Sequence, residues 1–175
     1  MEMLSTLDLS RAGELTIAKA GWVNPVFTLS DNMRTYGRLS YGWDWRRTGK
    51  LESAKQTWLI RPQRLFRRSI IVDDPQTGQT IRITRRNIWK NIAEAEFPDG
   101  QTIDFKRNGV FSKTHTWRIG EYNNILDIES RLRSYKQPFR IIPGAGSSGN
   151  NIDLILLAFI GVHLILLQRS HAVAS

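Results

Sequence analysis

The chain contains no cysteine, which excludes disulfide bonds, cysteine nucleophiles and zinc–thiolate sites. Histidine is scarce as well, and the positions of His115, His163 and His171 suggest no catalytic triad. Acidic residues at alternate positions, such as Glu94 and Glu96, are common on a sheet face and are weak evidence for a catalytic pair. We therefore predict a protein that is not an enzyme and that requires neither a cofactor nor a metal ion.

Acidic residues are few relative to bases, with 16 Asp and Glu against 25 Lys and Arg, for a formal net charge of +9. The first eight residues carry acids where a secretory signal peptide carries bases, and they lack a continuous apolar segment. We expect a cytoplasmic protein, with the periphery of a membrane as a second location. The net positive charge of the chain favours binding to anionic partners.

Long apolar runs are absent except for fourteen residues from Leu154 to Leu167, which are apolar on every face of a helix. About 20 such residues are needed to cross a bilayer core, and His163 lies inside the run. Asp153 and Arg169 flank it with charges suited to the two ends of a helix dipole, and Asn150 or Asn151 is the expected cap. We predict a helix buried in a protein core; a membrane tail anchor and an oligomer-interface helix remain alternatives.

The rest of the chain has apolar residues at a period of two, interrupted by turn-forming residues, as in an antiparallel meander. Turns with a defined chemistry are expected at Asp73–Gly78 and Pro98–Gly100, where proline and glycine separate β-rich segments. Twelve strands are predicted: Leu15–Ala18, Val26–Leu29, Thr35–Tyr41, Trp43–Arg46, Leu51–Ile60, Arg64–Val72, Thr80–Arg85, Trp89–Phe97, Thr102–Arg107, Thr114–Gly120, Ile125–Ser130 and Pro138–Ile142.

These parts assemble most simply as one domain over residues 1–175: strands within 14–142, a glycine-rich connector at 143–150 and a helix at 151–169. A closed barrel larger than about eight strands has a lumen that must be filled. A helix is about 10–12 Å wide, and fourteen residues span about 21 Å, comparable with the height of a barrel of tilted strands. We predict a mainly β protein, an antiparallel closed barrel of about twelve strands that encloses the hydrophobic C-terminal helix.

With its strand series, its turns at Asp73–Gly78 and Pro98–Gly100 and its apolar segment Ile152–Leu167, the chain resembles the tubby C-terminal-like superfamily. That superfamily includes phospholipid scramblases and LURP-one-related proteins. The resemblance implies a twelve-stranded barrel around a C-terminal helix and a preference for anionic membrane lipid. The palmitoylated cysteines and proline-rich N-terminal arm of the scramblases have no counterpart here.

The basic residues are concentrated between Arg61 and Lys90, where eight bases face only Asp73 and Asp74, for a local charge of +6. If the Asp73–Gly78 turn closes a hairpin, six arginines on neighbouring strands are candidate ligands of an anionic head group: Arg64, Arg67, Arg68, Arg82, Arg85 and Arg86. The simpler interpretation is that these arginines are the polar residues that outward-facing strand positions require, and that they protect sheet edges from pairing with other chains.

We interpret the chain as a non-enzymatic module that binds phosphoinositide or another anionic lipid through this arginine-rich hairpin. A tail-anchored membrane protein is one alternative. A nucleic-acid-binding barrel is another, because aromatic residues such as Trp43, Trp45, Phe66 and Trp89 lie among the bases.

Overall fold

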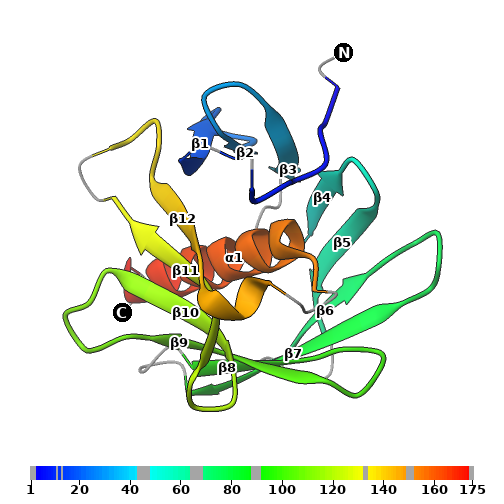
Figure 1. Ribbon diagram of the computed structural model, residues 1–175, viewed down its shortest axis with the longest axis vertical. Helices are drawn as coiled ribbons and strands as arrows, with labels where there is room; N and C mark the ends of the chain where they lie inside the picture. Colours follow the sequence, from blue (N-terminus) through cyan, green and yellow to red (C-terminus); the bar gives the residue numbers. More distant parts are fainter. Residues whose placement is uncertain are drawn as a thin grey trace.

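The computed structural model of the 175-residue chain describes residues 3–10, 12, 14–42, 48–63, 69–87, 92–131, 134–148 and 152–173. Twelve strands are followed by one short 3-10 helix and one long α-helix (Figure 1). Their bounds are β1 Leu15–Ala20, β2 Val26–Ser30, β3 Thr35–Tyr41, β4 Gly49–Ser53, β5 Thr57–Pro62, β6 Ser69–Asp73, β7 Thr80–Asn87, β8 Ile92–Glu96, β9 Thr102–Arg107, β10 Thr114–Ile119, β11 Asn123–Ser130, β12 Phe139–Pro143, η1 Ala145–Ser147 and α1 Leu154–Val173.

The twelve strands form one closed antiparallel barrel in which each strand pairs with its neighbours in sequence. Closure is made by β1 and β12, where Leu15 lies opposite Ile141 and Ile17 opposite Phe139. Among the twelve described strands, closure leaves no unpaired edge of the kind that promotes aggregation. The predicted fold class, strand number and closed barrel are therefore confirmed.

Both hairpin turns lie where the sequence predicts them. Asp73 of β6 pairs with Thr80 of β7, and the intervening turn is held by the backbone N–H of Gly78, which donates to the carbonyl of Asp74 at 2.9 Å. The Asp74 carboxylate accepts a further bond from the N–H of Gln76 at 2.8 Å, an Asx-type contact. Gly100 ends the β8–β9 turn with φ +82°, a conformation that favours glycine.

Because successive strands run in opposite directions, their connections alternate between the two ends of the barrel. The connections that follow β2, β4, β6, β8, β10 and β12 lie at the end where α1 begins, here named the α1-start end (Figure 1). Those that follow β1, β3, β5, β7, β9 and β11 lie at the other end, named the α1-finish end. This division determines which loop residues can act together.

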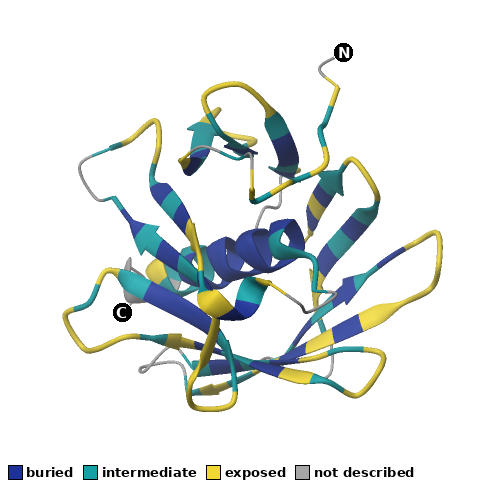
Figure 2. Ribbon diagram, in the orientation of Figure 1, coloured by how far each residue is buried: buried dark blue, intermediate teal, exposed yellow. Residues whose placement is uncertain are grey.

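The interior of the barrel is filled by alternate strand residues and by α1 itself, as Figure 2 shows in dark blue. On β7, for example, Ile81 and Ile83 are buried while Arg82 and Thr84 are exposed. Every residue of α1 from 155 to 165 is buried, and nearly all of these are apolar. Burial on all sides explains why the helix has no polar face.

Small residues let the helix pass close to the barrel wall. A Cβ at Gly161 of α1 would lie 2.3 Å from Cδ1 of Ile128, and one at Gly37 of β3 would lie 2.7 Å from a side-chain carbon of Ile155. Next to Gly161, the indole Nε1–H of Trp117 donates a hydrogen bond to the carbonyl of Leu157 at 2.9 Å. The sheet therefore holds α1 by a specific hydrogen bond as well as by close packing.

Asp153 caps the start of α1. Its Oδ1 accepts from the backbone N–H of Ile155 at 2.9 Å and of Leu156 at 3.2 Å, so the carboxylate serves both as cap and as favourable charge at the helix dipole. Asn150 and Asn151, the expected caps, lie outside the described residues. The helix runs to Val173, four residues beyond the predicted end at 169, and the connector contains the 3-10 turn Ala145–Ser147.

One predicted strand was wrong. The segment Leu51–Ile60 is not a single strand but spans parts of β4 and β5, which form a hairpin around residues 54–56. This turn contains neither glycine nor proline; instead, Ser53 Oγ accepts from the N–H groups of Lys55 at 3.3 Å and Gln56 at 3.2 Å. The predicted strand Trp43–Arg46 lies outside the described residues.

Candidate functional site

The six predicted arginines fall into three groups. Arg82 and Arg86 are exposed on the outer face of β7, whereas Arg85 is half-buried on the inner face, as the period of two predicts. Arg64, Arg67 and Arg68 lie outside the described residues. The described residues nearest to them, Gln63 and Ser69, are joined by a hydrogen bond at 2.9 Å from Gln63 N–H to the Ser69 carbonyl.

The outward arginines of the hairpin have acidic neighbours. Arg82 lies 3.9 Å from the carboxylate of Glu96, its direct partner on β8, and Arg86 pairs with Glu94 of the same strand. On the other side, Arg61 of β5 donates from Nε to Asp73 at 2.7 Å. These cross-strand pairs offset the positive charge of the outer face.

Sequence reasoning missed this neutralisation because the acids lie beyond the basic region. The available signal was the alternation of Glu94 and Glu96, which places both carboxylates on the same face as Arg82 and Arg86 once β7 and β8 pair. The net charge of the segment from Arg61 to Lys90 therefore overstates the charge that this face presents.

Charge is instead segregated between the two ends of the barrel. Described residues in the connections of the α1-start end include five acids and two bases: Asp31, Asp74, Asp99, Glu121 and Asp153, with Arg34 and Lys55. Described residues in the connections of the α1-finish end include three bases and no acid: Lys113, Arg131 and Lys136. Among the described connection residues, bases therefore predominate at the α1-finish end, where Arg131 is paired with Glu14, and acids at the α1-start end.

The α1-finish end also exposes large apolar side chains. Trp22 is 83% exposed, Val110 80% and Phe111 94%, and Val23 and Tyr135 are exposed as well. We name these five residues the apolar tips. They lie on the connections after β1, β9 and β11, and Figure 2 shows the latter two as yellow loops at the left. Pairs of apolar residues within turn sequences, such as Trp22-Val23 and Val110-Phe111, were the signal that could have identified them.

These three connections follow one another around the barrel rim, in the strand order β9, β10, β11, β12, β1. The backbone N–H of Ser130, at the end of β11, donates to the carbonyl of Lys113 at 2.9 Å. The N–H of Lys19, near the end of β1, donates to the carbonyl of Lys136 at 2.8 Å. The lysines and the apolar tips therefore share one continuous stretch of rim.

Side-chain contacts order part of this rim. The rings of Trp22 and Tyr135 stack with centroids 5.2 Å apart and an interplanar angle of 29°. The Lys19 ammonium lies 5.1 Å from the centroid of the Tyr135 ring, a cation–π contact. In the next connection, Arg107 Nε donates to the carbonyl of Ser112 at 2.6 Å. The tips are thus carried on loops with defined internal contacts.

Buried histidines lie inside the barrel rather than in an accessible site. Oη of Tyr41 and Nδ1 of His163 are hydrogen-bonded at 2.7 Å, and burial, together with the charge of Arg85, lowers the pKa of His163 to about 4. Burial and the charges of Arg107 and Arg169 lower the pKa of His115 to about 4 as well. His115 stacks on Phe105 with centroids 5.4 Å apart. Both imidazoles are therefore neutral near pH 7.

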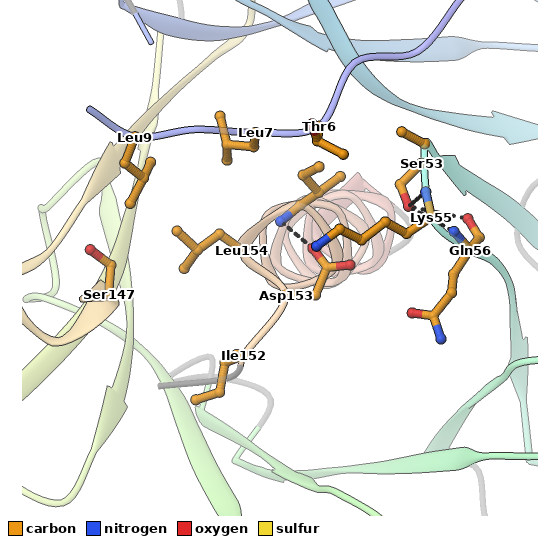
Figure 3. Close-up of a pocket in the computed structure, with 12 residues that line it drawn as sticks. Thr6, Leu7, Leu9, Ser53, Lys55, Gln56, Ser147, Ile152, Asp153 and Leu154 are labelled. Atoms are coloured by element: carbon orange, nitrogen blue, oxygen red, sulfur yellow. Dashed lines mark hydrogen bonds between the residues drawn. The ribbon is translucent and has the colours of Figure 1, made fainter. Parts of the chain in front are cut away.

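Two cavities flank the start of α1, at the end opposite the apolar tips. The larger, about 410 Å³, is lined by the N-terminal segment, the β4–β5 turn and the first residues of the helix. Figure 3 shows Leu7 and Leu9 over the first turn of α1, with Lys55 and Asp153 beside it. The smaller cavity, about 200 Å³, shares Asp153 and lies towards Trp58. Their mixed polar and apolar lining suggests no particular reaction.

In the part of the chain that the structure describes, no three or more His, Asp or Glu side chains lie together in a group that could hold a metal ion. Over the same residues, no helix combines the length and apolarity that crossing a membrane requires.

Comparison with models of known protein families, with curated proteins and with solved structures finds no match to this chain.

Proposed function

We propose that this protein is a non-enzymatic module that binds anionic lipid at the surface of a membrane, with the α1-finish end of the barrel facing the lipid. The observation that carries the proposal is the coincidence, on one stretch of rim, of exposed lysines with the apolar tips. Basic residues close to an anionic leaflet contribute about 1 kcal/mol each, and aromatic side chains favour the interface.

The architecture gives the proposal independent support. A closed barrel of twelve strands around a hydrophobic C-terminal helix is the fold that the resemblance to the tubby C-terminal-like superfamily implies. The helix fills the lumen, and the two cavities described above lie at its start rather than along it, which favours a function at the surface of the molecule.

The arginines of the β6–β7 hairpin region differ in how well they are placed to bind a lipid head group. Arg64, Arg67 and Arg68 lie outside the described residues and stay candidate head-group ligands on the evidence of the sequence. Of the described arginines, we include Arg86, which lies on the outer face of β7, as a head-group ligand, and leave out Arg85, which is half-buried on the inner face. Arg82 contributes less than Arg86, because it lies towards the α1-start end of β7, away from the apolar tips.

The proposal is tested by co-sedimentation of the full chain with vesicles of phosphatidylcholine alone, or mixed with phosphatidylserine or a phosphoinositide. We expect binding that requires the anionic lipid and weakens as salt shortens the Debye length from about 10 Å at 0.1 M to about 3 Å at 1 M. Equal binding to phosphatidylcholine alone, or none to any vesicle, would contradict the proposal.

A competing single-stranded oligonucleotide distinguishes lipid from nucleic acid as the partner. A nucleic-acid binder would hold the oligonucleotide with an affinity that falls linearly in log salt. If the oligonucleotide binds more tightly than the anionic vesicles and displaces the protein from them, the nucleic-acid alternative replaces the lipid proposal.

A further inference from the structure

We infer that the apolar tips enter the interfacial region of the bilayer, so that the protein recognises an assembled membrane and not an isolated lipid head group. This inference rests on the proposed function and adds to it a second mode of attachment, independent of charge. It assigns the anchoring to two apolar pairs, Trp22-Val23 and Val110-Phe111, with Tyr135 between them on the rim.

The side chains of the apolar tips are exposed and lie on neighbouring connections. Scattered single apolar residues are normal on a protein surface, whereas contiguous ones mark contacts with a membrane or a partner. Phe111 at 94% and Trp22 at 83% exposed have almost none of their surface covered by the barrel. Together with their neighbours they occupy three successive connections of one rim.

Internal contacts already order the loops that carry the apolar tips, without any contact with lipid. Stacking of Trp22 on Tyr135 orders the β1–β2 tip, and Gly21, with φ +79°, lets the chain turn sharply into it. In the β9–β10 connection, the N–H of Ser112 donates to the carbonyl of Gly109 at 3.1 Å, which closes a tight turn around Val110 and Phe111. Insertion would therefore cost little additional loop ordering.

The charge beside the apolar tips indicates the chemistry of their partner. Lys113 and Lys136 stand beside the tips, and no described carboxylate forms an ion pair with either lysine. Aromatic and aliphatic tips bordered by unpaired lysines match an anionic bilayer, in which the bases meet head groups and the apolar groups reach the acyl boundary. An apolar site for a protein partner would have no need of the uncompensated bases.

The opposite end of the barrel provides the matched control. Met33 is 90% exposed and Tyr122 93% exposed, each alone in its connection at the α1-start end. Replacing these two residues by serine removes a similar exposed apolar surface from the end that the proposal directs away from the membrane. Neither pair of changes is expected to alter folding, because Phe111 and Tyr122 lie almost entirely in solvent.

The test compares wild type, Val110→Ser/Phe111→Ser and Met33→Ser/Tyr122→Ser on vesicles of phosphatidylcholine with phosphatidylserine, in low salt and in about 1 M NaCl, which screens exposed charges. We expect wild type and the Met33/Tyr122 variant to retain measurable binding in high salt. The Val110/Phe111 variant should lose at least about tenfold in high-salt affinity, since burying one large apolar side chain is worth that much. Trp22→Ser/Val23→Ser, with thermal unfolding as a check on the stacked loop, provides a second variant.

The outcomes separate the inference from the function on which it rests. If wild type binds in low salt but high salt releases it completely, and the tip variants behave the same, insertion is wrong and charge-based lipid binding stands. If wild type binds no anionic vesicle, the proposed function fails. If wild type is a dimer in solution and the Val110/Phe111 variant is a monomer, the tips form a contact with a second copy, and the inference is overturned.

Discussion

The phenol oxygen of Tyr41 on β3 lies 2.7 Å from Nδ1 of His163 on α1, and this hydrogen bond joins the barrel wall to its central helix. The two rings also stack, with centroids 5.7 Å apart. Burial raises the pKa of Tyr41 far above its usual range and lowers that of His163 to about 4, so both groups are neutral. A neutral pair can be buried at low cost only while its hydrogen bond is made.

We therefore predict that Tyr41→Phe destabilises the protein by about 1–3 kcal/mol, because Nδ1 of His163 loses its partner in the core. Urea unfolding followed by circular dichroism gives the change in the free energy of unfolding. Tyr122→Phe, at a side chain that is 93% exposed, is the control and should have no measurable effect. Equal stability of the two variants would show that the bond contributes nothing.

The two buried histidines predict a loss of stability in mild acid. Their pKa values are lowered to about 4 in the folded protein from 6.5, so between these values the unfolded chain binds protons that the folded chain does not. Stability is complete above about pH 6.5 and falls as the pH drops towards 4, by about 2 kcal/mol per histidine between pH 7 and pH 5. Urea unfolding at the two pH values measures the difference, and His115→Leu should remove roughly half of it. A free energy of unfolding that does not change over this range would contradict the predicted shifts.

Close packing at Gly161 predicts that Gly161→Ala is destabilising, although alanine is the better helix former. The new Cβ would lie 2.3 Å from Cδ1 of Ile128 and 2.9 Å from Nε1 of Trp117, so these two side chains must shift within the packed core. Overpacking of this kind costs about 1–3 kcal/mol. Gly42→Ala is the control, because a Cβ there meets nothing within 4 Å. Thermal unfolding of both variants decides the prediction, and a stabilised Gly161→Ala would refute it.

A charge placed on the central helix should abolish folding. Ile160 is fully buried, and an aspartate in its place would have to be buried without a partner or protonated, at a cost of several kcal/mol. We expect Ile160→Asp to be unfolded or insoluble, as judged by circular dichroism and sedimentation. The control, Tyr122→Asp, introduces the same group at an exposed position. A folded, soluble Ile160→Asp would mean that the helix is not the core of the barrel.

Much of the fold could be predicted because strands and helix leave different periods in the sequence. The period of two identified most strands, and the apolar run Leu154–Leu167 identified α1 and its place inside the barrel. The β4–β5 turn was missed because Ser53 closes it through its side chain, without glycine or proline. Side-chain turns of this kind leave a weak signal in the sequence.

The candidate site was only partly accessible to sequence reasoning. Counting bases along the chain found the region around Arg82 and Arg86 but could not show that Glu94 and Glu96 lie beside them on the next strand. The bases of the α1-finish end became visible as a group only once the direction of each strand was known, since Lys113 and Lys136 are far apart in sequence from one another and from Trp22.

The central claim is that the α1-finish end binds anionic membranes, and charge reversal at the two ends tests it most directly. Lys113→Glu/Lys136→Glu and Arg34→Glu/Lys55→Glu make the same change in net charge, the first at the α1-finish end and the second at the α1-start end. We predict that the first weakens binding to phosphatidylserine-containing vesicles by at least about thirtyfold, since each removed base is worth about 1 kcal/mol, and that the second changes it little. Equal weakening by both pairs would mean that only net charge matters, and would contradict an oriented membrane-binding end.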